Sequence, residues 1–242
     1  MNIAGKSVLI TGSNRGIGRA LVDEALKRGA KRVYAGVRKE TKFNDSRVIP
    51  LILDVTNNSQ ITEAAAQIES LDVLINNAGI ALYDDPGNIE SIQQQFNVNL
   101  FGLSKVTHAF LPHLKRSKGA VINNLSMAGV AALPVIPGYS MSKAAAINLT
   151  QSLRALYSSQ GVSVHAAFLG PIDTDMNRGF DIPKATTELA ARGIFDGLEK
   201  NEEEIFPDPA SQSIAEGWRN GVAKGLEKQF AGFVPSNSPQ AK

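Results

Sequence analysis

Short apolar runs alternate with longer amphipathic stretches along most of the chain, and this alternation constrains the fold more than any other feature. Most of the runs are continuously apolar, which is typical of parallel strands buried on both faces. The predicted strands are Ser7 to Thr11, Arg32 to Val37, Val48 to Asp54, Val73 to Asn76, Ala120 to Leu125 and Ser163 to Leu169. Helices are predicted between them at 16–28, 59–70, 91–117 and 139–160.

This order predicts an α/β fold, a Rossmann-type doubly wound parallel sheet with helices on both faces. In such a sheet the binding crevice lies at the carboxyl ends of the strands. The chain of 242 residues suits a single domain, and it shows neither an internal repeat nor a linker that would separate two. After Gly170 the alternation stops, and residues from Asn177 to Ser213 are predicted to cover a substrate. The acidic run at 202–209 is interpreted as a solvated edge strand.

Composition excludes several classes of protein. A net charge of +2 with scattered basic residues gives no case for a nucleic-acid partner. The absence of cysteine excludes disulfides and thiolate metal sites, and His108 and His113 lack the spacing of a helical metal pair, so no metal site is expected. Because no apolar stretch has the length of a membrane span or signal peptide, we expect a cytoplasmic protein without a membrane partner.

A glycine-rich turn joins the first predicted strand to the first predicted helix. It places Gly12, Gly16 and Gly18 in the segment 11–18, where glycines permit a tight turn and close approach of a pyrophosphate to the helix N-terminus. The spacing differs from the general Gly-x-Gly-x-x-Gly fingerprint, and glycine clusters are often ordinary turns. The strand–turn–helix context nevertheless favours nucleotide binding.

Tyr139 and Lys143 lie four residues apart in a predicted helix and therefore share one face. A free phenol titrates near pH ~10. An ammonium group beside it favours the phenolate and is expected to lower the phenol pKa. Such a pair is commonly an ordinary helix face, so its interpretation as a proton donor and acceptor depends on the other motifs. Ser126, thirteen residues before Tyr139, is one of them.

Together these motifs resemble the short-chain dehydrogenase/reductase family. Three further motifs of that family follow in the expected order: Asn-Asn-Ala-Gly at 76–79, Asn-Val-Asn at 97–99 and Asp-Thr-Asp-Met at 173–176. The resemblance spans residues 6 to about 176. It implies an oxidoreductase that transfers hydride between a nicotinamide cofactor and a small-molecule carbonyl or alcohol substrate.

The resemblance also assigns catalytic roles. Tyr139 would be the general acid in carbonyl reduction, and Lys143 would bind the nicotinamide ribose and lower the pKa of the phenol. Ser126 would hold the substrate oxygen, and Asn99 would support a water-mediated proton relay through Lys143. Taken singly, Asn99 and Ser126 are equally well explained as capping or turn residues.

The same resemblance implies a cofactor site assembled from several strand ends. Its residues would be Gly12, Ser13, Asn14, Arg15, Gly16, Ile17, Gly18, Arg38, Asp54, Val55, Asn77, Ala78, Gly79, Tyr139, Lys143, Gly170, Ile172 and Thr174. Asp54 resembles the acid that meets the adenine amino group. One departure is Leu169-Gly170-Pro171, where the family usually has Pro-Gly, and it makes the contacts of Ile172 and Thr174 less certain.

Charge at the end of the second predicted strand predicts the cofactor. NAD-preferring members carry an acid there for the adenosine ribose, but here Arg38 follows the strand and the first acid is Glu40. A carboxylate would repel a 2′-phosphate, whereas Arg15 and Arg38 would bind it through charge-assisted hydrogen bonds. The sequence therefore predicts NADP(H).

The predicted activity is that of an NADPH-dependent carbonyl reductase, reversible as an alcohol dehydrogenase, on a small hydrophobic ketone or aldehyde. The apolar residues expected at the substrate, which are alternatively core residues, are Met127, Val130, Leu133, Val135, Ile136, Met176 and Phe180. Two alternatives are a dehydrogenase that oxidises a sterol or hydroxy acid, and a non-catalytic NADP(H)-sensing protein. Helices 91–117 and 139–160 resemble those through which family members form homodimers or homotetramers.

Overall fold

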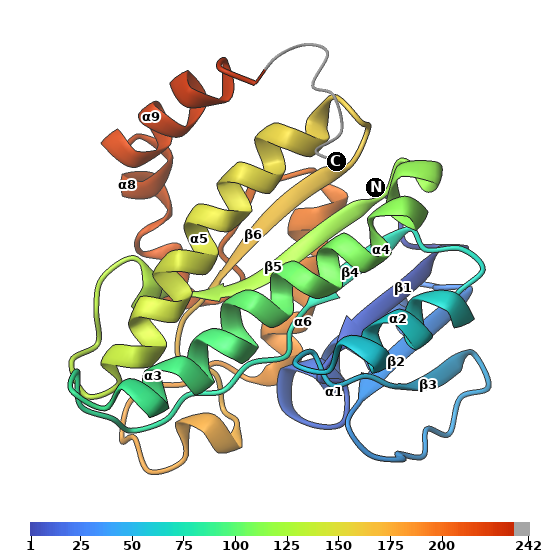
Figure 1. Cartoon of the computed structure of the whole chain (residues 1–242), viewed down its shortest axis with the longest axis horizontal. Helices are drawn as coiled ribbons and strands as arrows, with labels where there is room; N and C mark the ends of the chain where they lie inside the picture. Colours follow the sequence, from blue (N-terminus) through green and yellow to red (C-terminus); the bar gives the residue numbers. More distant parts are fainter. Residues whose placement is uncertain (235–242) are drawn as a thin grey trace.

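The computed structural model describes residues 1–234, and within them seven parallel strands form one sheet in the order β3-β2-β1-β4-β5-β6-β7 (Figure 1). The strands are β1 (Ser7–Thr11), β2 (Arg32–Val37), β3 (Val48–Ile52), β4 (Val73–Asn76), β5 (Ala120–Ser126), β6 (Ser163–Leu169) and β7 (Glu204–Ile205). The chain runs outward from β1 to β3, returns to pair β4 with β1, and runs outward again to β7. This is the predicted doubly wound arrangement in a single domain, with its reversal of strand order between β1 and β4.

Helices cover both faces of the sheet (Figure 1). The helices on the two faces are α2 (Asn58–Gln67), α4 (Leu103–Ser117) and α5 (Pro137–Ser158) on one, and α1 (Gly16–Lys27) and α6 (Thr187–Glu199) on the other. Neighbouring residues of β1 enter different cores: Leu9 lies in the core with Phe110, whereas Ile10 lies in the core with Leu21 and Phe195. Because strands are buried on both faces, their sequences are continuously apolar.

The predicted helix at 91–117 is interrupted. It consists of α3 (Ile89–Phe96), a π-helical segment η1 (Asn97–Gly102) and then α4. A π segment widens the helix locally and often marks a functional site, and this one carries Asn99. The third strand is shorter than predicted and ends at Ile52, since the chain then turns and the Asp54 N–H donates to the Gln60 side chain at 2.8 Å.

The predicted covering segment, 177–213, begins as a loop and continues into helices and a strand of the main fold. It follows the 3₁₀ turn η3 (Asp175–Asn177), and after a loop it forms α6, whose inner face packs in the core with α1. The chain then adds β7 to the edge of the sheet and forms α7 (Pro209–Gln212). Two further helices, α8 (Ala215–Arg219) and α9 (Val222–Ala231), lie beside α5 (Figure 1). None of the helices within residues 1–234 is long and apolar enough to cross a bilayer.

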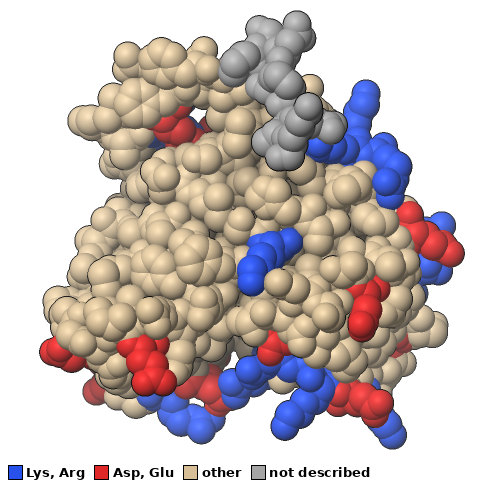
Figure 2. All heavy atoms as spheres, in the orientation of Figure 1, with Lys and Arg blue, Asp and Glu red and all other residues tan. Residues whose placement is uncertain are grey.

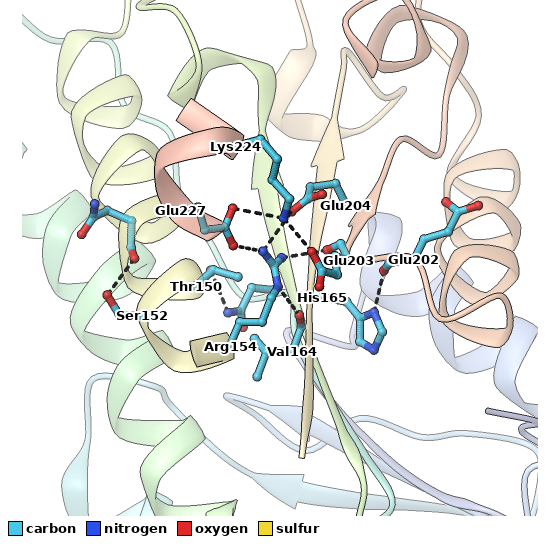
Figure 3. Close-up of polar contacts among 12 residues, drawn as sticks. Thr150, Ser152, Arg154, Val164, His165, Glu202, Glu203, Glu204, Lys224 and Glu227 are labelled. Carbon is cyan, nitrogen blue, oxygen red and sulfur yellow. Dashed lines mark hydrogen bonds and ion pairs between the residues drawn. The ribbon is translucent and has the colours of Figure 1, made fainter. Parts of the chain in front are cut away.

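The acidic run at 202–209 is not the solvated edge that the sequence suggested. Glu204 pairs in parallel with β6 and is only 6% exposed. Arg154 of α5 and Lys224 of α9 enclose it, and Figure 3 shows both cations pointing toward the acidic side chains. The sequence did not predict this arrangement, because the two compensating cations lie 50 and 20 residues from Glu204 in the chain.

Lys224, Glu204 and Glu227 of this cluster are buried, whereas the side chain of Glu203 is 55% exposed. The Lys224 Nζ lies 2.6 Å from an oxygen of Glu203, 2.7 Å from one of Glu204 and 3.1 Å from one of Glu227. The Arg154 guanidinium lies 2.9 Å from Glu204 and also pairs with Glu227. Burial acts to lower the pKa of Lys224, but hydrogen bonds to Glu203 and Glu204 outweigh it and raise the pKa. The cluster joins the last strand to the C-terminal helices.

Replacing Lys224 with methionine is expected to destabilise the protein. Methionine fills a similar volume but leaves Glu204 and Glu227 buried with one cation fewer, and breaking a buried pair in this way lowers the free energy of unfolding by about 3–5 kcal/mol. Urea denaturation measures the change. The control is Lys228→Met on the same helix, where the lysine is exposed and the expected change is within about 0.5 kcal/mol. Equal stability of Lys224→Met and the parent protein would contradict the assigned role of the cluster.

Candidate active site

Two adjoining cavities open where the parallel strands end. The first, of about 330 Å³, lies over the glycine-rich turn and is called here the turn cavity. The second, of about 460 Å³, contains Tyr139 and is called the tyrosine cavity. Both are lined by Ile17, Asn77, Gly79, Thr174 and Met176, so a ligand long enough to occupy one can extend into the other.

In the glycine-rich turn, the backbone faces the turn cavity without intervening side chains at Gly12, Gly16 and Gly18. Gly12 and Gly16 have φ angles of +69° and +54°, which L side chains rarely adopt. A Cβ on Gly18 would lie 2.0 Å from the carbonyl oxygen of Gly12, so no other residue fits there. Helix α1 begins at Gly16 beside this cavity, and the free N–H groups of a helix start attract an anion.

A hydrogen-bonded connection fixes this turn to the neighbouring strand. The Asn77 amide donates to the carbonyl oxygens of Thr11, at 2.9 Å, and of Gly12, at 3.3 Å. In return the Thr11 hydroxyl accepts from the backbone N–H of Asn77 and Ala78, both at 3.0 Å. The strand order predicts this contact, because β1 and β4 are adjacent at the reversal.

Most of the predicted cofactor residues line the cavities. Those on the turn cavity are Gly12, Asn14, Arg15, Gly16, Ile17, Gly18, Arg38, Asp54, Val55, Asn77, Ala78, Gly79 and Thr174. Gly170 and Ile172 line the tyrosine cavity together with Tyr139 and Lys143. Ser13 lines neither: it is fully buried and its hydroxyl donates to the Ile10 carbonyl at 2.5 Å, so it supports the turn from beneath.

Several lining residues escaped prediction. Gly36, Thr56, Val98 and Asp175 belong to the turn cavity, and the sequence treated Gly36 as an ordinary strand residue. A Cβ there would lie 3.1 Å from the Ile10 carbonyl oxygen, and a glycine inside a strand often signals such a close approach. Asp175 pairs with Arg15 at 2.8 Å across the cavity, a contact between segments 160 residues apart.

Ser126 and Tyr139 meet at the tyrosine cavity. Ser126 ends β5, Tyr139 lies in the first turn of α5, and both residues line the tyrosine cavity. Burial raises the pKa of the Tyr139 phenol, and the nearby Ser126 hydroxyl opposes this shift only in part. The sequence predicted the opposite direction, from the charge of Lys143. Burial, which depends on the fold, dominates instead, so the phenol keeps its proton at neutral pH.

Lys143 is buried below the same cavity. Its ammonium donates to the carbonyl oxygen of Asn124 at 2.8 Å and lies 5.7 Å from the centre of the Tyr139 ring. Burial lowers the pKa of Lys143 from 10.5 to about 8. The predicted sharing of one helix face is confirmed, since both side chains line the tyrosine cavity.

Asn99 projects from the π segment toward the site but lines neither cavity. Its amide donates to the Ile80 carbonyl and to the Ser142 hydroxyl, both at 2.9 Å, and its oxygen accepts from the Ile80 N–H at 2.9 Å. A Cβ on Gly79 would lie 3.2 Å from the Asn99 oxygen and 3.8 Å from the Lys143 nitrogen. Gly79 therefore keeps the space between Asn99 and Lys143 open. The water relay through Lys143 stays a prediction.

Comparison with known proteins gives the family. A family model described as short chain dehydrogenase matches residues 6–184. The chain belongs to the short-chain dehydrogenase/reductase family. It is 31% identical over 225 residues to 11-beta-hydroxysteroid dehydrogenase-like 2 of Arabidopsis thaliana, covering 83% of this chain and 73% of that protein. It is 33% identical over 183 residues to the uncharacterized oxidoreductase YvrD of Bacillus subtilis, covering 70% of each.

Solved structures of the family agree. A short chain dehydrogenase from Burkholderia cenocepacia in complex with NADP has a TM-score of 0.87 and 35% sequence identity, covering 97% of this chain and all of that one. ElxO with NADP bound has a TM-score of 0.77 and 26% identity, covering 86% of this chain and 99% of that one. This chain is thus an oxidoreductase with the fold of the short-chain dehydrogenase/reductase family.

The lining of the tyrosine cavity is mainly apolar. Of the predicted residues, Met127, Leu133, Ile136, Met176 and Phe180 line the tyrosine cavity. Val130 and Val135 do not, and they are 43% and 49% exposed because the loop between Ser126 and Tyr139 turns them outward. Tyr83 was not predicted, yet it lines the cavity and stacks on Phe180 with ring centres 5.8 Å apart. Within the described residues no group of three His, Asp or Glu side chains is placed to hold a metal ion.

The burial of Lys143 predicts how stability changes with pH. Its pKa is about 8 in the folded protein against 10.5 in a model peptide, so between these values the unfolded chain binds more protons. Unfolding therefore becomes less favourable as pH rises through this window, and the effect is lost as pH falls through about 8.

We compare the free energy of unfolding of the parent protein and Lys143→Met at pH 7 and pH 10. The parent is expected to gain up to about 3 kcal/mol relative to the variant across that interval. The control is Lys105→Met, at an exposed position, for which no such gain is expected. If the free energies of unfolding of the parent and Lys143→Met differ by the same amount at both pH values, the pKa of Lys143 is not lowered by burial.

Proposed function

We propose that the protein is an NADPH-dependent carbonyl reductase, reversible as an alcohol dehydrogenase, that acts on a small hydrophobic ketone or aldehyde. The observation that carries the proposal is that Ser126, Tyr139 and Lys143 line one apolar cavity that adjoins the turn cavity. A hydroxyl pair there would face a carbonyl oxygen, while the neighbouring cavity has room for an elongated cofactor.

The turn cavity fits a dinucleotide. Its floor is the glycine turn, where side chains at Gly12, Gly16 and Gly18 would collide with the backbone or require an unfavourable φ angle. Arg38 and Arg15 supply positive charges at its edge, Arg15 being paired with Asp175, and Glu40 does not line it. This donor set suits a 2′-phosphate and supports NADP(H), as do the two structural neighbours that hold NADP. When bound, the dinucleotide would supply or accept a hydride.

The protein's own residues would bind and protonate the substrate. Ser126 would hold the carbonyl oxygen, and Tyr139 would donate its proton to that oxygen as negative charge develops there. Because burial raises the pKa of Tyr139, the phenol stays protonated until the substrate requires the proton. Lys143, held by the Asn124 carbonyl, would bind the ribose of the cofactor and replenish the proton by way of Asn99.

The apolar lining favours a neutral, hydrophobic substrate. Lys143 is the charged side chain on the described lining of the tyrosine cavity, and its ammonium is already held from below. The same lining, with the name of the Arabidopsis relative, supports one alternative: oxidation of a sterol-like alcohol. A measured preference for NAD⁺ would favour that alternative. A non-catalytic sensor of NADP(H) is less well supported, since binding alone does not need the Ser126–Tyr139 pair.

We also propose that copies of the chain pair through the face formed by α4 and α5. In Figure 2, charged side chains of both signs lie mainly along the lower and right-hand edges of this view, whereas the area over α5 shows almost none. Phe101, Met141 and Leu156 are 41–49% exposed on these helices and the adjoining π segment. A homodimer or homotetramer would bury them.

Replacing Tyr139 with phenylalanine tests the proton donor. Loss of the hydroxyl is expected to lower kcat for NADPH-dependent ketone reduction by about 100- to 10,000-fold. Binding of NADPH, followed by its fluorescence, should change little, because the ring remains. The matched control is Tyr83→Phe, which removes the hydroxyl from a second tyrosine of the same cavity and should keep kcat within a few-fold. Unchanged turnover of Tyr139→Phe on aryl, aliphatic and diketone substrates would remove Tyr139 from the mechanism.

Replacing Arg38 with alanine tests the cofactor. We expect KM for NADPH to rise about 10- to 100-fold, the value of one charged hydrogen-bonding partner. KM for NADH should remain close to that of the parent, because NADH has no 2′-phosphate. Lys39→Ala is the control, since Lys39 is the exposed neighbour and does not line the turn cavity. Equal changes in KM for NADPH and NADH would show that Arg38 does not bind the 2′-phosphate.

A further inference from the structure

Asp208 is a buried carboxylate that lies outside the catalytic set. It follows β7, caps the start of α7 and is 1% exposed. One of its oxygens accepts from the Ser211 N–H at 3.0 Å. The other accepts from the Ser211 hydroxyl at 2.9 Å and from the N–H of Gly170 at 2.9 Å.

The contact with Gly170 goes beyond what the helix cap requires. An N-terminal cap of this kind needs a side-chain oxygen on the N–H three residues later, which Ser211 already provides. The second oxygen instead reaches 38 residues back in the chain, to the end of β6. A buried charge that is used in this way fixes the relative position of two segments.

Gly170 accommodates Asp208 at very close range. A Cβ on Gly170 would lie 2.5 Å from an Asp208 oxygen and 2.8 Å from the Cβ of Ala210, so any side chain at this position would displace the carboxylate. Gly170 also begins the turn that lines the tyrosine cavity, together with Pro171 and Ile172. The requirement for glycine here therefore comes from Asp208 and Ala210.

The far end of the same turn is held separately. The Asn177 amide donates to the Ile172 carbonyl at 2.8 Å, and the Asp173 N–H donates to the Ala185 carbonyl at 2.8 Å. Pro171 has no N–H to contribute. At the β6 end of the turn Asp208 holds the Gly170 N–H, and the Pro171 carbonyl accepts from the Ala185 N–H at 3.0 Å. Through Thr174 the segment borders both cavities.

Asp208 is itself placed by the last strand. Glu204 of β7 is paired with β6 and fixed by Lys224 and Arg154, as Figure 3 shows, and Asp208 follows only four residues later. The segment 204–208 thus connects Lys224 of α9 to the turn that lines the tyrosine cavity.

We propose that Asp208 is a positioning residue that holds the turn at 170–172 in the place required by the nicotinamide end of NADPH and by the substrate. The proposal rests on the proposed function, because it assumes that the cofactor extends from the turn cavity into the tyrosine cavity. It assigns no contact between Asp208 and either ligand. Its effect is local to one end of the cofactor.

The variant Asp208→Asn separates this role from the helix cap. Asparagine is a good N-cap, so its side-chain oxygen can still accept a hydrogen bond from the Ser211 N–H. Its NH₂ group then faces the Gly170 N–H, and two donors cannot bond. Ser211→Ala is the matched control, since it removes the hydroxyl that donates to the same carboxylate and leaves the Gly170 contact in place. Asp208→Ser is a second variant that caps the helix but is too short to reach Gly170.

The experiment measures dissociation constants of NADPH and of 2′,5′-ADP by calorimetry, with urea denaturation for each variant. The fragment 2′,5′-ADP lacks the nicotinamide half and would occupy the turn cavity alone. Asp208→Asn and Asp208→Ser are expected to weaken NADPH about tenfold and to leave 2′,5′-ADP within twofold of the parent. Ser211→Ala should leave both nucleotides within twofold.

The outcomes are distinguishable. Equal weakening of both nucleotides, with lowered stability, would mean that Asp208 has a general structural role, and unchanged NADPH binding in the Asp208 variants would equally overturn the proposal. Failure of the parent protein to bind either nucleotide would overturn the proposed function, and this inference with it. Only selective loss of NADPH affinity supports the positioning role.

Discussion

A single series of hydrogen bonds connects the glycine-rich turn to the buried lysine, and the rest of the site depends on it. Asn77 holds the carbonyls of Thr11 and Gly12, and the Asn124 amide donates to the Asn77 oxygen at 3.0 Å. The Asn124 carbonyl in turn accepts from Lys143. Because these contacts cross from β1 through β4 to β5 and α5, the two cavities cannot shift relative to each other without breaking buried or partly buried hydrogen bonds.

A second polar series strengthens the same region beneath α4 and α5. The Asn76 amide donates to Thr107 of α4 and to Asn123 of β5, both at 2.9 Å, and Asn123 donates to Thr150 of α5 at 2.9 Å. These residues lie among apolar side chains and are almost fully buried. Together the two series fix the ends of β4 and β5, from which Asn77 and Ser126 follow.

Burial also decides the chemistry of the two titratable groups in the tyrosine cavity. It raises the pKa of Tyr139 and lowers the pKa of Lys143, so both shifts favour the neutral forms. A phenol that keeps its proton suits an acid in carbonyl reduction. The lysine, with a pKa of about 8, retains its charge through most of the physiological range and can still exchange its proton. The same low-polarity surroundings that shape the tyrosine cavity therefore set the protonation of Tyr139 and Lys143.

The sequence by itself determined the order of strands and helices, the single parallel sheet and most of the residues that line the turn cavity. These depend on local patterns, because apolar runs define buried strands, glycines define the turn and helical periodicity places Tyr139 beside Lys143. Only the tertiary structure decided the direction of the Tyr139 pKa, the outward position of Val130 and Val135, and the burial of Ser13. It also decided that Glu204 pairs with Arg154 and Lys224, and that Asp208 reaches Gly170. Each of these depends on contacts between residues far apart in the chain, whose approach no local pattern encodes.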